Sequence, residues 1–307
     1  MILRKSFLLW AALVWVAASP SAFAQTEAKD LPPGHKTVLA EGVPIVYTDQ
    51  GEGDPLMIFT PYPFSTALWS DLARRLSTSM RVIVIEPPGL RTPDALKWDF
   101  SDIRLLEIYR ELVRSLKLSQ VHVLGVGESG AEAVAFAHHW PHLTKSVVSI
   151  NGLESAKWSD EGVPVMIDAL RGVGSKAEGM LFSLLSARWR DKAPGESERE
   201  SLLVPLGDGT RTKAFQSRMD GWRDSLRSGT VPIMLPNLNK PLLSIRSKDD
   251  QFLTRDYIER TRRYAPAPLI QYEVVAGAGH FAFIDQPEKT AELIRSFTSK
   301  HSASKGF

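Results

Sequence analysis

The sequence contains no cysteine among its 307 residues, which excludes a disulfide framework and a lipid anchor on an N-terminal cysteine. It also lacks an excess of charge, because 37 basic residues stand against 35 acidic ones. A nearly neutral chain argues against nucleic acid as the partner. With 43% apolar and 23% charged residues, the composition is that of a globular protein stabilised by a hydrophobic core.

The apolar run at the N-terminus, residues 7–18, is shorter than the roughly 20 residues that span a bilayer. Arg4 and Lys5 precede this run, and the small residues Ala22 and Ala24 follow it. This is the arrangement of a secretory signal peptide. We therefore expect cleavage after Ala24 and a periplasmic or secreted protein with no stable membrane insertion afterwards; an uncleaved anchor on the same domain is the alternative.

Short apolar runs alternate with segments of helical period over residues 36–154 and 237–300. Apolar residues recur at helical spacing near 69–76, 103–116 and 133–137. The alternation predicts an α/β fold whose sheet is mostly parallel, with helices on both faces and an antiparallel hairpin at its start. The expected strands are 37–40, 44–48, 56–59, 81–85, 121–124, 147–150, 241–245 and 269–275.

Two segments depart from this alternation. Residues 25–35 have no hydrophobic period and are expected to form a flexible leader. Residues 155–236 are helix-like and interrupted by glycine and proline, which predicts a helical cap inserted between the two parts of the core. The large apolar side chains of the cap either line a substrate cleft or form its own small core; they are Trp158, Met180, Phe182, Trp189 and Trp222.

Three short motifs accompany this order of elements: Gly-Val-Gly-Glu-Ser-Gly at 125–130, Gly-Ala-Gly-His at 277–280 and Asp-Gln-Pro-Glu at 285–288. Together they resemble the α/β-hydrolase family. The resemblance implies an eight-stranded sheet carrying a nucleophile, an acid and a histidine in that order along the chain. It assigns the histidine to His280 and the acid to Asp250, with Asp249 as the alternative acid.

The resemblance leaves two positions for the nucleophile. An alignment without gaps places Gly127 there, whereas a shift of two residues gives Gly-Glu-Ser-Gly-Ala and places Ser129 there. Our leading hypothesis is Ser129, with the amides of Tyr62 and Gly130 as the oxyanion hole. Glu128 is a third candidate, as a carboxylate nucleophile, although it fits neither alignment.

These residues predict a hydrolase that acts on a small ester or related carbonyl compound through a Ser-His-Asp mechanism without a cofactor. The alternative is a noncatalytic binding or interaction protein with Gly127 in the nucleophile position. His138, His139 and His142 are the candidate metal ligands, and His138 and His142 have the spacing to share one face of a helix. Pro141 is expected to end that helix before His142, so no metal site is predicted. The sequence does not indicate an oligomeric state.

Overall fold

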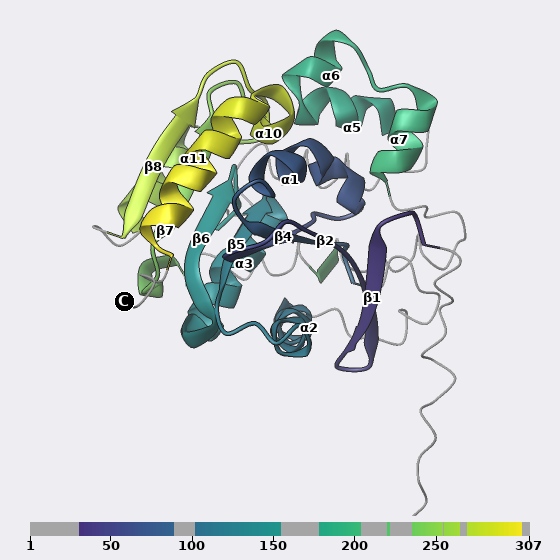
Figure 1. The fold of residues 1–307 in the computed structure, drawn as a ribbon. Coiled ribbons are helices and arrows are strands. Elements are labelled where there is room, and N and C mark those ends of the chain that lie inside the picture. The colour runs from purple at the N-terminus through teal and green to yellow at the C-terminus, as the bar shows by residue number, and fades with distance from the viewer. Residues whose placement is uncertain are drawn as a thin grey trace, which may run out of the picture.

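The computed structural model describes residues 31–88, 102–154, 178–203, 220–221, 235–253, 255–264 and 269–302. Its centre is an eight-stranded sheet in the order β1-β2-β4-β3-β5-β6-β7-β8 (Figure 1). The pairs β1–β2 and β2–β4 are antiparallel, and the remaining pairs are parallel. The strands are β1 (His35–Ala40), β2 (Val43–Gln50), β3 (Pro55–Phe59), β4 (Arg81–Ile85), β5 (Val121–Val126), β6 (Thr144–Ile150), β7 (Leu242–Ser247) and β8 (Ile270–Val275). The predicted fold class is confirmed.

Helices cover both faces of the sheet (Figure 1). Successive residues of a strand point to opposite faces, so Leu56 and Ile58 of β3 pack with α1 and α11, whereas Met57 and Phe59 pack with α2 and α3. The longer helices are α1 (Ser70–Leu76), α2 (Asp102–Ser115), α3 (Glu128–His139), α5 (Glu178–Leu185), α7 (Glu196–Leu202), α9 (Arg255–Tyr264) and α11 (Pro287–Lys300). Shorter turns of helix are η3 (Thr66–Trp69), η5 (Pro141–Leu143), α6 (Ala187–Asp191), η7 (Leu235–Asn237) and α10 (Ala282–Asp285).

The helices described in the predicted cap are α5, α6 and α7, which lie together in Figure 1, with α6 beside α10 and α7 against η3. Phe182 and Trp189 are buried, and their rings meet edge to face with centroids 5.1 Å apart. Both rings also contact aromatic residues of the core, Phe182 against Phe64 and Trp189 against Phe281. These two side chains thus join the cap to the core. Trp158, Trp222 and the side chain of Met180 lie outside the described residues.

The N-terminal 30 residues, which hold the predicted signal peptide and most of the leader, also lie outside the described residues. The cleavage site and the export of the protein therefore stay predictions, as do the exact limits of the cap. Within the ranges that the structure describes, no helix is long and apolar enough to span a bilayer.

Candidate functional site

Gly127 forms the tip of a tight turn between β5 and α3. Its backbone has φ +57° and ψ −121°, a region that residues with a side chain rarely adopt. The turn is held from both sides: the Gly127 amide donates to the Ile150 carbonyl at 3.1 Å, and the Gly127 carbonyl accepts from the Leu153 amide at 2.9 Å. A Cβ placed on Gly127 would lie 2.8 Å from Nε2 of His280. Gly127 therefore occupies the position that faces the histidine, as in the alignment without gaps.

Ser129 lies elsewhere, inside the first turn of α3. Its side chain is fully buried, and its hydroxyl donates to the Val126 carbonyl at 3.0 Å and accepts from the Val126 amide at 2.9 Å. Contrary to our leading hypothesis, the structure does not bring Ser129 to His280. The amide of Gly130 likewise lies three residues beyond the tip of the turn rather than next to it.

The packing of α3 against β6 explains why the shifted alignment is not adopted. β5 pairs with β6 as far as Val126 opposite Ile150, and α3 begins two residues later. A Cβ on Gly130 would lie 2.8 Å from the Gly152 Cα, so only glycine allows the helix to approach this closely. Moving the turn by two residues would place a bulkier side chain at this contact.

His280 and Asp250 form a buried hydrogen-bonded pair. Nδ1 of His280 lies 2.8 Å from Oδ2 of Asp250, and the side chains are 2% and 1% exposed. Because the carboxylate accepts at Nδ1, that nitrogen carries the proton and Nε2 presents its lone pair toward Gly127. Asp250, which follows β7, also accepts from the Phe252 amide at 2.8 Å through its other oxygen. Asp249 instead accepts from the Gly277 amide at 3.2 Å and does not contact the imidazole in this way.

Asn151, which directly follows β6, holds the backbone of the His280 loop. Its Nδ2 donates to the His280 carbonyl at 2.8 Å and to Ser247 Oγ at 2.8 Å, and its Oδ1 accepts from the Ser247 amide at 2.8 Å. Its φ of +44° is left-handed, a conformation that asparagine tolerates better than most residues. Sequence analysis missed Asn151; its only signal was an Asn-Gly pair after a buried strand.

A buried ion pair lies beside Asn151. Arg246 of β7 contacts Glu154 and donates to the Gly152 carbonyl at 2.8 Å, and the two charged side chains are 1% and 0% exposed. Burial alone would lower the pKa of Arg246, but the charge of Glu154 holds it above its ordinary value. This pair fixes the turn after β6 from which Asn151 extends.

The predicted oxyanion donor Tyr62 is engaged by a carboxylate. The Tyr62 amide donates to Oε1 of Glu128 at 2.8 Å, and Glu128 is only 3% exposed. Glu128 is the first residue of α3, where the helix dipole favours a negative charge. The structure thus brings Tyr62, Glu128, Gly127 and His280 together around one point.

A small cavity of about 20 Å³ lies at that point. A single water requires roughly 10–15 Å³, so the cavity has room for one. Its walls are polar on the side of Glu128 and His280 and apolar elsewhere; they consist of Pro61, Tyr62, Phe64, Val126, Gly127, Glu128, Leu185, His280 and Phe281.

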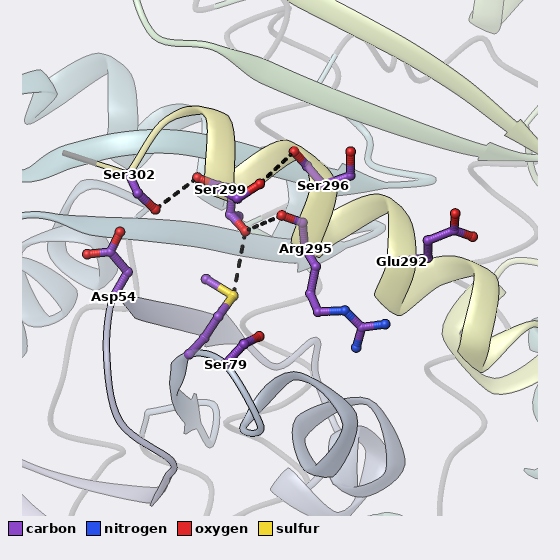
Figure 2. A pocket seen from close by; sticks show the side chains of 9 residues that line it. Asp54, Ser79, Glu292, Arg295, Ser296, Ser299 and Ser302 are labelled. Carbon is purple, nitrogen blue, oxygen red and sulfur yellow. Dashed lines mark hydrogen bonds between the residues drawn. The ribbon is translucent and has the colours of Figure 1, made fainter. Parts of the chain in front are cut away.

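A larger hollow, of about 480 Å³, lies at the opposite edge of the sheet (Figure 2). Asp54 precedes β3 at this edge, whereas ligands of open α/β sheets bind beyond the carboxyl ends of the strands. The hydroxyls of Ser299 and Ser302 both donate to backbone carbonyls of α11 at 3.1 Å. We therefore place the functional site at His280, despite the smaller volume there.

The described residues contain no group of three His, Cys, Asp or Glu that could hold a metal ion. His138 and His139 end α3, with ring centroids 5.3 Å apart, and Pro141 begins the next turn.

Comparison with known proteins gives a consistent picture. A family model described as "Alpha/beta hydrolase family" matches residues 57–293. A 2-hydroxy-6-oxononadienedioate/2-hydroxy-6-oxononatrienedioate hydrolase of Pseudomonas putida is 24% identical over 277 residues, covering 82% of this chain and 91% of the relative.

Among solved structures, a meta-cleavage product hydrolase from Pseudomonas fluorescens is 21% identical with a TM-score of 0.72, covering 86% of this chain and 97% of that one. A thermophilic esterase from Thermogutta terrifontis is 18% identical with a TM-score of 0.69, covering 88% and 99%. At these identities the solved structures establish the fold, and the family match covers most of the chain. The protein therefore belongs to the alpha/beta hydrolase family.

Proposed function

We propose that the protein is a hydrolase of a small carbonyl compound in which His280 activates a water molecule directly, without a covalent intermediate. One observation carries this proposal: Nε2 of an imidazole oriented by Asp250 faces Gly127, and both residues line a cavity with room for one water. A related serine hydrolase would place its nucleophilic hydroxyl at this position. The printed names of the relatives, which are hydrolases and an esterase, support the same class of reaction.

The chemistry follows from the positions of the two ring nitrogens. Nε2 of His280 takes a proton from the water while its oxygen attacks the carbonyl carbon, and Asp250 stabilises the imidazolium that forms. With an ester as substrate, the imidazolium then returns the proton to the alkoxide leaving group, and the tetrahedral intermediate collapses to an acid and an alcohol. General-base catalysis of this kind contributes roughly 10²–10⁴-fold to the rate.

A second function is favoured by Glu128. Its carboxylate occupies the Tyr62 amide that a substrate oxyanion would use, and loss of one oxyanion donor costs roughly 10²–10³-fold in turnover. In this alternative the protein binds a ligand without catalysis, and the pair of His280 and Asp250 shapes the binding site.

Hydrolysis of p-nitrophenyl acetate, combined with labelling by a fluorophosphonate probe, tests the proposal. We expect the parent to release p-nitrophenol at a steady rate without an initial burst and to remain unlabelled, because no acyl-enzyme forms. His280→Gln should lose the activity, whereas Ser129→Ala, the matched control, should retain it.

Two outcomes would contradict the proposal in different ways. Labelling of the parent that Ser129→Ala abolishes would restore Ser129 as the nucleophile. A parent no more active than His280→Gln, with both proteins folded by circular dichroism, would support the noncatalytic alternative.

A further inference from the structure

Asp285, the last residue of α10, bridges two segments that are distant in the sequence. Its Oδ1 accepts from the Ser186 hydroxyl at 2.6 Å and from the Arg188 amide at 2.9 Å. Its Oδ2 accepts from the Ala187 amide at 3.0 Å and from the Gly279 amide at 2.8 Å. One carboxylate therefore joins two segments: Oδ1 binds the start of α6 alone, and Oδ2 is shared between α6 and the loop that carries His280. The helices α6 and α10 are neighbours in Figure 1.

The two bridged segments form walls of the cavity at Gly127. Leu185, just before α6, lines the cavity from the cap, and His280 lines it from the loop. The Phe281 amide donates to the Leu185 carbonyl at 2.7 Å, which ties the same two segments a second time. A shift of α6 would thus be transmitted to the residues on both sides of His280.

We propose that Asp285 is a positioning residue that couples the cap segment 178–203 to the His280 loop. Its carboxylate fixes the position of the cavity wall at Leu185 and the position of the base His280. The effect on turnover rests on the proposed function, whereas the coupling itself does not. A carboxylate suits this role because it offers acceptors only, and all four of its partners are donors. An asparagine would turn an NH₂ group toward two of those donors.

Amide hydrogen exchange followed by mass spectrometry tests the coupling without any substrate. In Asp285→Asn we expect peptides covering 185–189 and 277–283 to exchange at least about tenfold faster than in the parent. The first segment donates three hydrogen bonds to the carboxylate and the second donates one, from the Gly279 amide, so the same side chain holds both. Peptides from β5 should keep the parent rate. Glu288→Gln is the matched control, since Glu288 is a nearby acid with a 74% exposed side chain, and it should leave both segments unchanged.

Asp285→Glu provides a second variant that keeps both acceptor oxygens. Both segments of Asp285→Glu should exchange faster than in the parent and more slowly than in Asp285→Asn. If Asp285→Asn is too unstable to assay, faster exchange of both segments together in Asp285→Glu than in the parent tests the coupling. Faster exchange in only one of the two segments, in either variant, would overturn the coupling, as would parent-like exchange in both segments of Asp285→Asn.

Kinetics then test the consequence for the base. On p-nitrophenyl acetate, Asp285→Asn should lower kcat and raise KM, with kcat/KM reduced about tenfold or more, because small displacements of a catalytic group can cost up to roughly 10²-fold. A parent that is inactive while Asp285→Asn loosens both segments would refute the proposed function and leave the coupling in place. An active parent whose kcat and KM match those of Asp285→Asn would refute the positioning role.

Discussion

Restoring a nucleophile at the tip of the turn is the most direct perturbation of this site. Gly127→Ser introduces a Cβ that would lie 2.8 Å from Nε2 of His280, closer than these atoms normally approach. It also places a side chain on a backbone with φ +57°. The left-handed backbone costs about 1–2 kcal/mol and overpacking about 1–3 kcal/mol, so we expect the free energy of unfolding to fall by about 2–5 kcal/mol.

Urea denaturation and fluorophosphonate labelling check the two halves of this expectation. Gly127→Ala should lose as much stability as Gly127→Ser, because it shares the Cβ and the backbone strain. Only Gly127→Ser should gain labelling, and combining it with His280→Gln should abolish that labelling. A Gly127→Ala variant within about 0.5 kcal/mol of the parent would refute the geometry of the turn, since ordinary surface substitutions stay within that range. Failure of folded Gly127→Ser to react would refute the role of His280 as a base.

Three further substitutions test other parts of the site and fold. Ser129→Ala should lower the free energy of unfolding by about 1 kcal/mol, the usual loss for its hydroxyl contacts, and leave turnover unchanged; a large loss of turnover would contradict its place in α3. Asn151→Asp replaces the donor to the His280 carbonyl with an acceptor, so the free energy of unfolding measured with denaturant should fall by about 1–3 kcal/mol. A value like that of the parent would contradict the role of Asn151 in holding the His280 loop. Burial lowers the pKa of His122 from 6.5 to about 4. As the pH falls, the imidazole is therefore protonated in the unfolded chain before it is protonated in the folded protein. The free energy of unfolding of the parent should fall by about 2–3 kcal/mol between pH 7 and 4.5. His122→Gln should lack that part of the pH dependence, and an equal loss in both proteins would contradict it.

Much of the fold could be predicted because the central strands are buried on both faces. Such strands appear in the sequence as short apolar runs, and every expected strand overlaps one in the structure. The ends of the strands were harder to predict. β5 was expected to end at Leu124 but continues to Val126, because Gly125 and Val126 pair with Ser149 and Ile150 of β6. Glycine has a weak strand preference, so nothing local marked this extension.

The end of β5 at Val126 places Gly127, and not Ser129, at the tip of the turn. Gly127 and Ser129 are two residues apart, and the choice between them depends on where β5 stops and how closely α3 approaches Gly152. Both constraints come from segments more than twenty residues away in the sequence. A pattern of glycine and serine alone could not supply them.

The residues that support the site were hidden for a related reason. His280 and Asp250 could be placed because a loop histidine and an acid after a strand form a recognisable pattern. Asn151 acts by hydrogen bonds to backbone groups about 100 residues or more away, and Asp285 joins the nearby Gly279 amide to the start of α6, about 100 residues away. Contacts of this kind depend on the folded positions of both segments and leave no periodic or local signal in the sequence.

The burial of the His280–Asp250 pair bears on the choice between the two proposed functions. Removing a carboxylate and an imidazole from water carries a desolvation penalty, and replacing a buried ionisable pair with apolar residues is often neutral or stabilising. The pair is therefore a poor device for stability alone. Asn151 holds the loop to the end of β6, and Asp285 ties the loop to the start of α6 in the cap, so the imidazole is fixed with its Nε2 toward Gly127. A base that is oriented on three sides and open toward a cavity for one water favours water activation over a purely structural role.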